Sequence, residues 1–267
     1  MLTDEDIRQA ADTLYQAECD ARQIDPLTLK HPGMTLDDAY AVQRACVDRK
    51  IATGRRVIGY KIGLTSRAMQ SAMHINEPDY GVLLDDMVFA DGAQIDAARL
   101  CDPRIEVELA FVLKHRLVGT QLNVCDVLNA TDYVVPALEL IAARSFRVHP
   151  QTGYTRKIHD TIADNAASAG ILMGGRPIRP DQMDLRWIGA LCYRNGVLEE
   201  TGLAAGVLNH PANGICWVAK RFAAHGIALE PGQIILSGSF TRPVTVVAGD
   251  TIHADFGPLG GISCRFL

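Results

Sequence analysis

Arg-Ile-Glu-Val-Glu-Leu-Ala-Phe-Val-Leu, residues 104–113, has the β-branched and apolar composition of a β-strand. Residues i and i+2 of a strand point to the same face, so Glu106 and Glu108 project together, roughly 7 Å apart at the backbone. The rest of the stretch is nearly all apolar, as in a strand that is buried on both faces. Two like charges on a buried face are costly unless a partner neutralises them, and a hard cation such as Mg²⁺ or Mn²⁺ would do so.

A second strand-like run, residues 132–141, carries one more isolated acid, Glu139, in an apolar context. Three carboxylates from two neighbouring strands would bind one face of an octahedral cation and leave positions for a bidentate ligand and a water. The simplest alternative is that Glu106 and Glu108 lie on a solvated strand face. A glycosidase is disfavoured, because its two acids lie on opposite sides of the bond, at least about 5 Å apart, whereas this pair converges on one point.

Composition narrows the class of protein. The 267 residues suffice for one large β-rich domain or two smaller ones, and 48% hydrophobic with 21% charged residues is ordinary for a globular protein. A net charge of −5 argues against a nucleic-acid surface. The acidic N-terminus does not resemble a signal peptide, and no apolar run approaches the roughly 20 residues of a membrane span. The seven scattered cysteines lack a C-x-x-C pair. We therefore expect a cytoplasmic protein with reduced thiols and no membrane partner.

Helical signals dominate the first part of the chain. Thr3 and Thr35 each precede an Asp by three residues, which is a capping-box pattern with Asp in the usual Glu position. Helices are expected over residues 4–23 and from Thr35 to Gly54, where glycine ends the second one.

After residue 55 the pattern changes to short β-strands. Asn195-Gly196 is a strong type I′ hairpin signal, and residues 211–225 predict a helix that Asn209 would cap. Short strands at close spacing indicate a sandwich or barrel-like roll. The sequence thus predicts an α+β fold, with a helical N-terminal region at 1–55 and a mixed β-roll catalytic domain at 56–267. The other short strands are expected at residues 57–64, 187–193, 197–201, 234–239, 244–247, 251–256 and 262–266.

Two ionisable residues are candidates for proton transfer. Lys61 lies inside the strand at 57–64 between two glycines, and burial would lower its pKa and make it a plausible proton shuttle. The alternative is a lysine that extends to solvent from a strand edge. Asp79 falls in residues 71–86, which we expect to form a long irregular loop. Its alternative role is that of a turn residue.

Residues 145–157 form a basic segment in an acidic protein. One interpretation is an anion-binding rim or lid that uses Arg147, Arg156 or Lys157. The other is a solvated surface loop.

Several stretches form a recognisable set: the Gly-Tyr-Lys-Ile-Gly-Leu-Thr-Ser run at 59–66, the Glu106/Glu108 strand, Glu139, Leu-Ser-Gly-Ser at 236–239, Pro-Ala-Leu-Glu-Leu at 136–140, Ser-Phe-Arg-Val-His-Pro at 145–150 and His-Asp-Thr-Ile-Ala-Asp-Asn-Ala at 159–166. Together they resemble the fumarylacetoacetate hydrolase superfamily, and within it the hydratase and decarboxylase branch of aromatic meta-cleavage pathways.

The resemblance implies a β-roll that holds Mg²⁺ or Mn²⁺ on Glu106, Glu108 and Glu139, in a homo-oligomer built of pentamers. The His–Glu dyad of the superfamily's hydrolases has no secure counterpart here, so C–C bond hydrolysis is not expected. The implied activity is hydration of a seven-carbon unsaturated 2-oxo diacid, an assignment that depends mainly on residues 145–166. Alternatives are hydration of 2-hydroxypenta-2,4-dienoate, decarboxylation of 4-oxalocrotonate, or a non-catalytic partner subunit.

The implied hydration reaction suggests a role for each candidate site residue. A 2-oxo acid would chelate the cation, and Lys61 would move the protons with Asp79 as its partner or as the group that positions water. Ser237 and Ser239, in a turn that contains glycine, could hydrogen-bond the carboxylate next to the ketone. Arg147 or Arg156 would hold the distal carboxylate.

Overall fold

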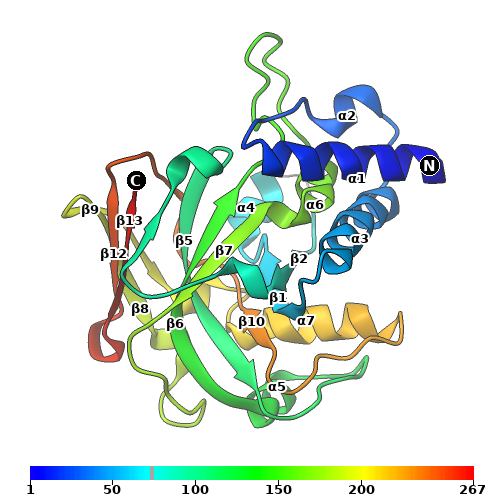
Figure 1. Cartoon of the computed structure of the whole chain (residues 1–267). Coiled ribbons are helices and arrows are strands. Elements are labelled where there is room, and N and C mark those ends of the chain that lie inside the picture. The colour runs from blue at the N-terminus through cyan, green and yellow to red at the C-terminus, as the bar shows by residue number, and fades with distance from the viewer. Residues whose placement is uncertain (73–74) are drawn as a thin grey trace.

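The computed structural model describes residues 1–72 and 75–267, in which two β-sheets lie beside a group of helices (Figure 1). The larger sheet has the order β2-β1-β10-β5-β6-β7-β3, with β11 paired to β5. The smaller has the order β4-β13-β12-β8-β9. The strands of the larger sheet are β1 (Val57–Gly63), β2 (Asp79–Leu84), β3 (Val88–Phe89), β5 (Pro103–Leu113), β6 (Thr131–Ala142), β7 (Ser168–Met173), β10 (Ile234–Leu236) and β11 (Val244–Thr245). Those of the smaller are β4 (Ala93–Ile95), β8 (Gly189–Arg194), β9 (Val197–Leu203), β12 (Thr251–Asp255) and β13 (Gly261–Phe266).

Both sheets are mixed. Strand β1 runs parallel to β10, β3 to β7 and β4 to β13, while the other pairs are antiparallel. The longest pairing joins β5 to β6, and its register places Glu106 directly opposite Glu139. The α+β class and the mixed sheets expected from the sequence are confirmed.

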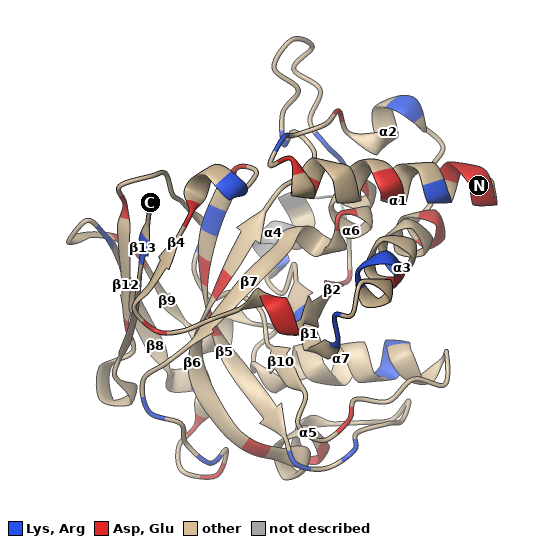
Figure 2. Cartoon of the chain, viewed as in Figure 1, with Lys and Arg blue, Asp and Glu red and all other residues tan. Residues whose placement is uncertain are grey.

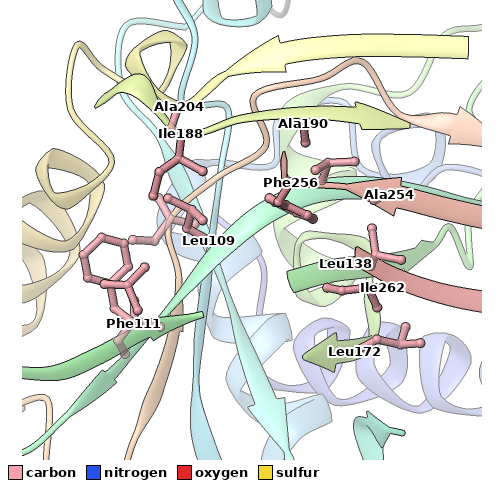
Figure 3. Packing of buried hydrophobic residues seen from close by; sticks show 14 of the residues in the cluster. Leu109, Phe111, Leu138, Leu172, Ile188, Ala190, Ala204, Ala254, Phe256 and Ile262 are labelled. Carbon is pink, nitrogen blue, oxygen red and sulfur yellow. The ribbon is translucent and has the colours of Figure 1, made fainter. Parts of the chain in front are cut away.

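Side-chain alternation along β5 separates the core from the site. Ile105, Val107, Leu109 and Phe111 are fully buried and belong to the main hydrophobic cluster. That cluster also contains residues of β8, β12 and β13, so it fills the space between the two sheets, as the close view of Leu109, Phe111 and their neighbours shows (Figure 3). The two-residue period then sends the intervening glutamates to the opposite face of the large sheet.

Helices lie beside the two sheets. In Figure 1, α1, α2, α3 and α6 gather at one end and α7 lies below them. The first four share a hydrophobic cluster that includes Leu14, Val42 and Ile162. Within the described chain, no helix is long and apolar enough to cross a membrane. The helices are α1 (Asp4–Cys19), α2 (Leu27–Lys30), α3 (Leu36–Ala52), α4 (Arg67–Ala72), α5 (Val124–Ala130), α6 (Ile158–Ala163) and α7 (Ala212–Ala223). Short 3₁₀ turns lie at Asp85–Met87, Ala97–Arg99, Asn165–Ala167, Leu185–Trp187, Ala204–Gly206 and Gly257–Leu259.

The local signals at two helix starts and one hairpin are confirmed. Thr3 and Thr35 cap α1 and α3, and each forms the full capping box with the Asp three residues on. Asn195 and Gly196 both have positive φ, as a type I′ turn between β8 and β9 requires. The division of the chain at residue 55 stays a prediction.

Three expectations were wrong. The first helix ends at Cys19, not at residue 23. The stretch 71–86 is not an irregular loop: residues 73–74 lie outside the described part, but Asp79 begins the edge strand β2, where a preceding proline costs no ladder hydrogen bond. Asn209 does not cap α7, because its φ of 70° is left-handed and Pro211 takes the cap position.

Replacement of Phe111 by alanine should lower the free energy of unfolding by roughly 3–5 kcal/mol, because it opens a cavity between the sheets. Val247→Ala, at a side chain that is 59% exposed, should change it by less than about 0.5 kcal/mol. Urea denaturation of both variants measures the difference. Equal effects would contradict the placement of Phe111 in the core.

Candidate active site

Three glutamates converge on the face of the large sheet opposite the main core. Glu106 and Glu139 are cross-strand partners on β5 and β6, and Glu108 follows on the same face of β5. One carboxylate oxygen from each lies within 4.8 Å of the others. Figure 2 shows acidic segments within β5, whereas many other charged residues lie on helices and loops. Glu108 is 1% exposed, and Glu106 is only partly exposed at the wall of a cavity, so the solvated-face alternative does not hold.

These carboxylates are incompletely satisfied by the rest of the described chain. Glu108 Oε2 accepts a hydrogen bond from the Gly238 N–H at 2.8 Å, but Glu108 Oε1 and both oxygens of Glu139 accept none. Buried polar atoms normally have a partner, so the free oxygens indicate a ligand. The oxygen-only donor set suits a hard divalent cation, and the three residues fit one.

Burial and mutual repulsion favour the neutral forms of these acids. The pKa of Glu108 is raised well above its usual range, first by burial and then by Glu139 and Glu106. Burial also raises the pKa of Glu139 to about 8, although the nearby Lys61 ammonium opposes the shift. A bound cation would remove this cost, because it favours the ionised carboxylates.

Lys61 lies beside the triad on β1, and it is 3% exposed. Its Nζ is 3.3 Å from Glu139 Oε1. The expectation that burial lowers its pKa was wrong. Burial does act in that direction, but Glu139 and Glu106, helped by Asp79 and Glu108, outweigh it and raise the pKa. Lys61 is therefore an ammonium held among carboxylates, and a cation on the glutamates would weaken that hold.

Asp79 faces the same place from β2. Its position opposite Gly63 in the ladder is close enough that a Cβ on that glycine would lie 2.2 Å from Asp79 Oδ1. A Cβ on Gly81 would likewise contact the Lys61 side chain at 3.1 Å. The two glycines thus make room for the buried side chains of Asp79 and Lys61. Oδ1 has no hydrogen-bond partner among the described residues, and burial raises the pKa of Asp79.

A cavity of about 580 Å³ opens over these groups. It brings together six of the residues singled out from the sequence: Lys61, Asp79, Glu106, Arg147, Arg156 and Ser239. Ser237 is fully buried beneath it, and its hydroxyl has no partner in the described chain. The segment 145–157 is not simply a solvated loop, because Arg156 is 8% exposed while Lys157 faces solvent.

Sequence reasoning missed one wall of the cavity, the turn Asn165–Ala167. All three of its residues have left-handed φ, of 51°, 50° and 60°. The Asn165 side chain accepts from the Val82 N–H and donates to the Val82 carbonyl, so it extends the edge of β2 like one more strand residue. Asparagine is a known left-handed residue, but two alanines in that conformation carry no sequence signal.

The chain belongs to the fumarylacetoacetate hydrolase family: residues 56–267 match the model described as "Fumarylacetoacetate (FAA) hydrolase C-terminal". It is 60% identical, over 96% of both chains, to 2-oxo-hept-4-ene-1,7-dioate hydratase of Escherichia coli. It is 38% identical to 2-keto-4-pentenoate hydratase of Paraburkholderia xenovorans, over 99% of this chain and 96% of that protein. The structure of 4-oxalocrotonate decarboxylase from Pseudomonas putida G7, complexed with magnesium and adipate, superposes with a TM-score of 0.94, at 35% identity over 100% of this chain and 99% of that one. The resemblance noted from the sequence is confirmed.

Replacement of Glu106, Glu108 or Glu139 by glutamine should weaken Mg²⁺ binding by more than the roughly 10–100-fold typical of an outer-shell change, because a ligand charge is lost. Glu200→Gln is the matched control, since Glu200 lines the cavity but pairs with Arg242 at 2.7 Å. Titration calorimetry measures both. Unchanged affinity in Glu108→Gln would place the cation elsewhere.

Mg²⁺ binding should release protons near neutral pH. The raised carboxyl pKa values leave part of the metal-free triad protonated, and the cation binds only the ionised form. Affinity should therefore fall as pH drops from about 8 towards 6, well above the usual pKa of glutamate. Calorimetry in buffers of different ionisation enthalpy counts the protons. A binding enthalpy independent of the buffer would exclude this linkage.

Proposed function

We propose that the protein hydrates 2-oxo-hept-4-ene-1,7-dioate to 4-hydroxy-2-oxoheptanedioate, in the breakdown of homoprotocatechuate. The observation that carries the proposal is the set of three convergent glutamates beside Lys61, where Glu106 and Lys61 line a cavity that also holds buried arginines. The 60% identity to the E. coli hydratase supports the same reaction. The cation is Mg²⁺, with Mn²⁺ as its substitute, and the protein works in the cytoplasm as a homo-oligomer built of pentamers.

Each cavity residue has a part in this reaction. A divalent cation on Glu106, Glu108 and Glu139 supplies Lewis-acid polarisation of a 2-oxo acid. In its neutral form, which a cation on the glutamates would favour, Lys61 takes a proton from C3 and returns one to C5, which moves the double bond into conjugation with the ketone. Asp79 then orients the water that adds at C4, with the remaining proton going to C3.

The serines of the turn after β10 serve the acid end of the substrate. Ser239 lines the cavity, although its Oγ already bonds to the Thr241 carbonyl at 2.9 Å. Ser237 keeps a free buried hydroxyl. Both are proposed to hydrogen-bond the carboxylate next to the ketone. Arg147 or Arg156 is proposed to bind the distal carboxylate.

A decarboxylase is the second candidate, because the structure with the TM-score of 0.94 is one. The deciding assay gives the purified protein with Mg²⁺ the five-, six- and seven-carbon unsaturated 2-oxo acids. We expect fastest loss of absorbance with the seven-carbon diacid and a hydroxylated product that retains every carbon. Release of CO₂ would indicate decarboxylation instead. Metal binding without turnover of any acid would favour a non-catalytic partner subunit.

Lys61→Ala should reduce the rate on the order of 10²–10⁴-fold, as is typical when a general acid–base group is lost. Exchange of the C3 protons of a saturated 2-oxo diacid into D₂O isolates this step, and it should slow to the same extent. Lys114→Ala, at an exposed lysine outside the cavity, should leave exchange unchanged. Wild-type exchange in the Lys61 variant would assign proton transfer to another group.

A further inference from the structure

Arg156 is a buried charge to which the described part of the protein gives no hydrogen-bonded counterion. It lines the cavity and is 8% exposed. Its NH1 has no hydrogen-bond partner, and the nearest carboxylate oxygen, Asp164 Oδ2, is 3.9 Å away. Burial, with help from Arg147, lowers the pKa of Arg156 to about 10, so the group is still charged at neutral pH. A buried guanidinium without a hydrogen-bonded counterion is costly unless a ligand supplies one.

Asp164 forms only a long ion pair with Arg156, at 3.9 Å, because Arg144 binds it more closely. Arg144 Nε donates to Asp164 Oδ1 at 2.5 Å, and the backbone N–H of Arg144 donates to Oδ2 at 2.8 Å. The Arg144 NH2 group also donates to the Asp164 carbonyl, and NH1 donates to the Ser168 carbonyl at 2.9 Å. Arg144 thereby holds Asp164 in place at the start of the left-handed turn.

A second arginine, Arg147, also has a buried side-chain nitrogen without a hydrogen-bond partner. Arg147 Nε donates to Asp102 Oδ2 at 2.5 Å, while its buried NH2 has no partner among the residues described. Arg104 NH2 approaches the same oxygen at 3.5 Å.

Two arginines of this group, Arg147 and Arg156, line the cavity. Together with Arg104 and Arg144 they form ion pairs with only two aspartates, at 102 and 164. Glu18 lies 3.9 Å from Arg144, but it pairs more closely with Lys50, at 2.6 Å. The arginines are positively charged, whereas the triad of glutamates is acidic. They therefore suit a substrate carboxylate that the cation does not bind.

We propose that Arg144 is a positioning residue for substrate selection: its guanidinium holds Asp164 through Oδ1 and the main-chain carbonyl, beside the backbone N–H bond to Oδ2, and so keeps the Arg156 guanidinium free to bind the distal carboxylate of a diacid. The inference rests on the proposed function and assigns the diacid end of the substrate to Arg156. Arg147, already bonded to Asp102, contributes only its free NH2. Removal of the Arg144 guanidinium would free Asp164 Oδ1 to capture Arg156, while the backbone N–H bond to Oδ2 stays.

The first test compares substrates. Arg156→Gln should lower kcat/KM for the seven-carbon diacid by about 10–100-fold, the worth of a hydrogen bond to a charged group, and spare the five-carbon monoacid. Arg144→Gln should give the same selective loss, mainly in KM. Arg179→Gln, at an exposed arginine paired with Asp181, is the control and should change neither. Equal losses on both substrates would overturn the assignment.

The second test asks whether Asp164 is the cause. Arg144→Gln combined with Asp164→Asn removes the carboxylate that would capture Arg156, so preference for the diacid should return. A purely structural role predicts the opposite, because the double variant loses more contacts. Absence of recovery in a folded double variant would overturn the proposal. If Arg144→Gln does not fold, Arg144→Lys replaces it in the test. The lysine keeps the positive charge but loses the planar guanidinium with its several donors. This variant should show a partial loss of kcat/KM for the diacid.

A binding measurement keeps the inference separate from the reaction. Metal-loaded wild-type protein should bind adipate more tightly than hexanoate by calorimetry, and Arg156→Gln should abolish the difference. This result holds even if the enzyme hydrates neither substrate, in which case only the proposed function fails. Equal affinity for adipate and hexanoate in the wild type would contradict the distal-carboxylate site.

Discussion

The two-residue period of β5 is the constraint on which the molecule depends. One set of side chains on this strand closes the core between the two sheets, and the other set places Glu106 and Glu108 against Glu139. A shift of one residue in the register would bury the acids in the core and expose the apolar set, so core packing and site assembly are the same event. The apolar face therefore stabilises the fold and holds three repelling carboxylates together.

Two ionic groups of opposite sign meet at one cavity. Within the part of the chain that is described, oxygens of Glu108 and Glu139 and nitrogens of Arg147 and Arg156 have no hydrogen-bond partner. Neither group is complete by itself, because buried polar atoms need partners. A cation at one end and a diacid across the cavity would satisfy both. In this account, binding of the cation and the diacid supplies the hydrogen-bond partners that the folded chain lacks.

The sequence carries part of this arrangement. The shared face of Glu106 and Glu108 follows from strand periodicity, and the capping boxes at Thr3 and Thr35 follow from local chemistry. The raised pKa of Lys61 could not be read from its own strand, because the acids that cause it come from β2, β5 and β6. The occupation of Asp164 by Arg144 depends on two segments that converge only in the fold.

The central claim is that one divalent cation binds between the three glutamates. Its most direct measurement is anomalous diffraction from crystals grown with Mn²⁺. The account predicts a single strong peak within coordination distance of one oxygen from each of Glu106, Glu108 and Glu139. Ordered glutamates with no peak between them, or with the cation bound at another set of residues, would contradict it.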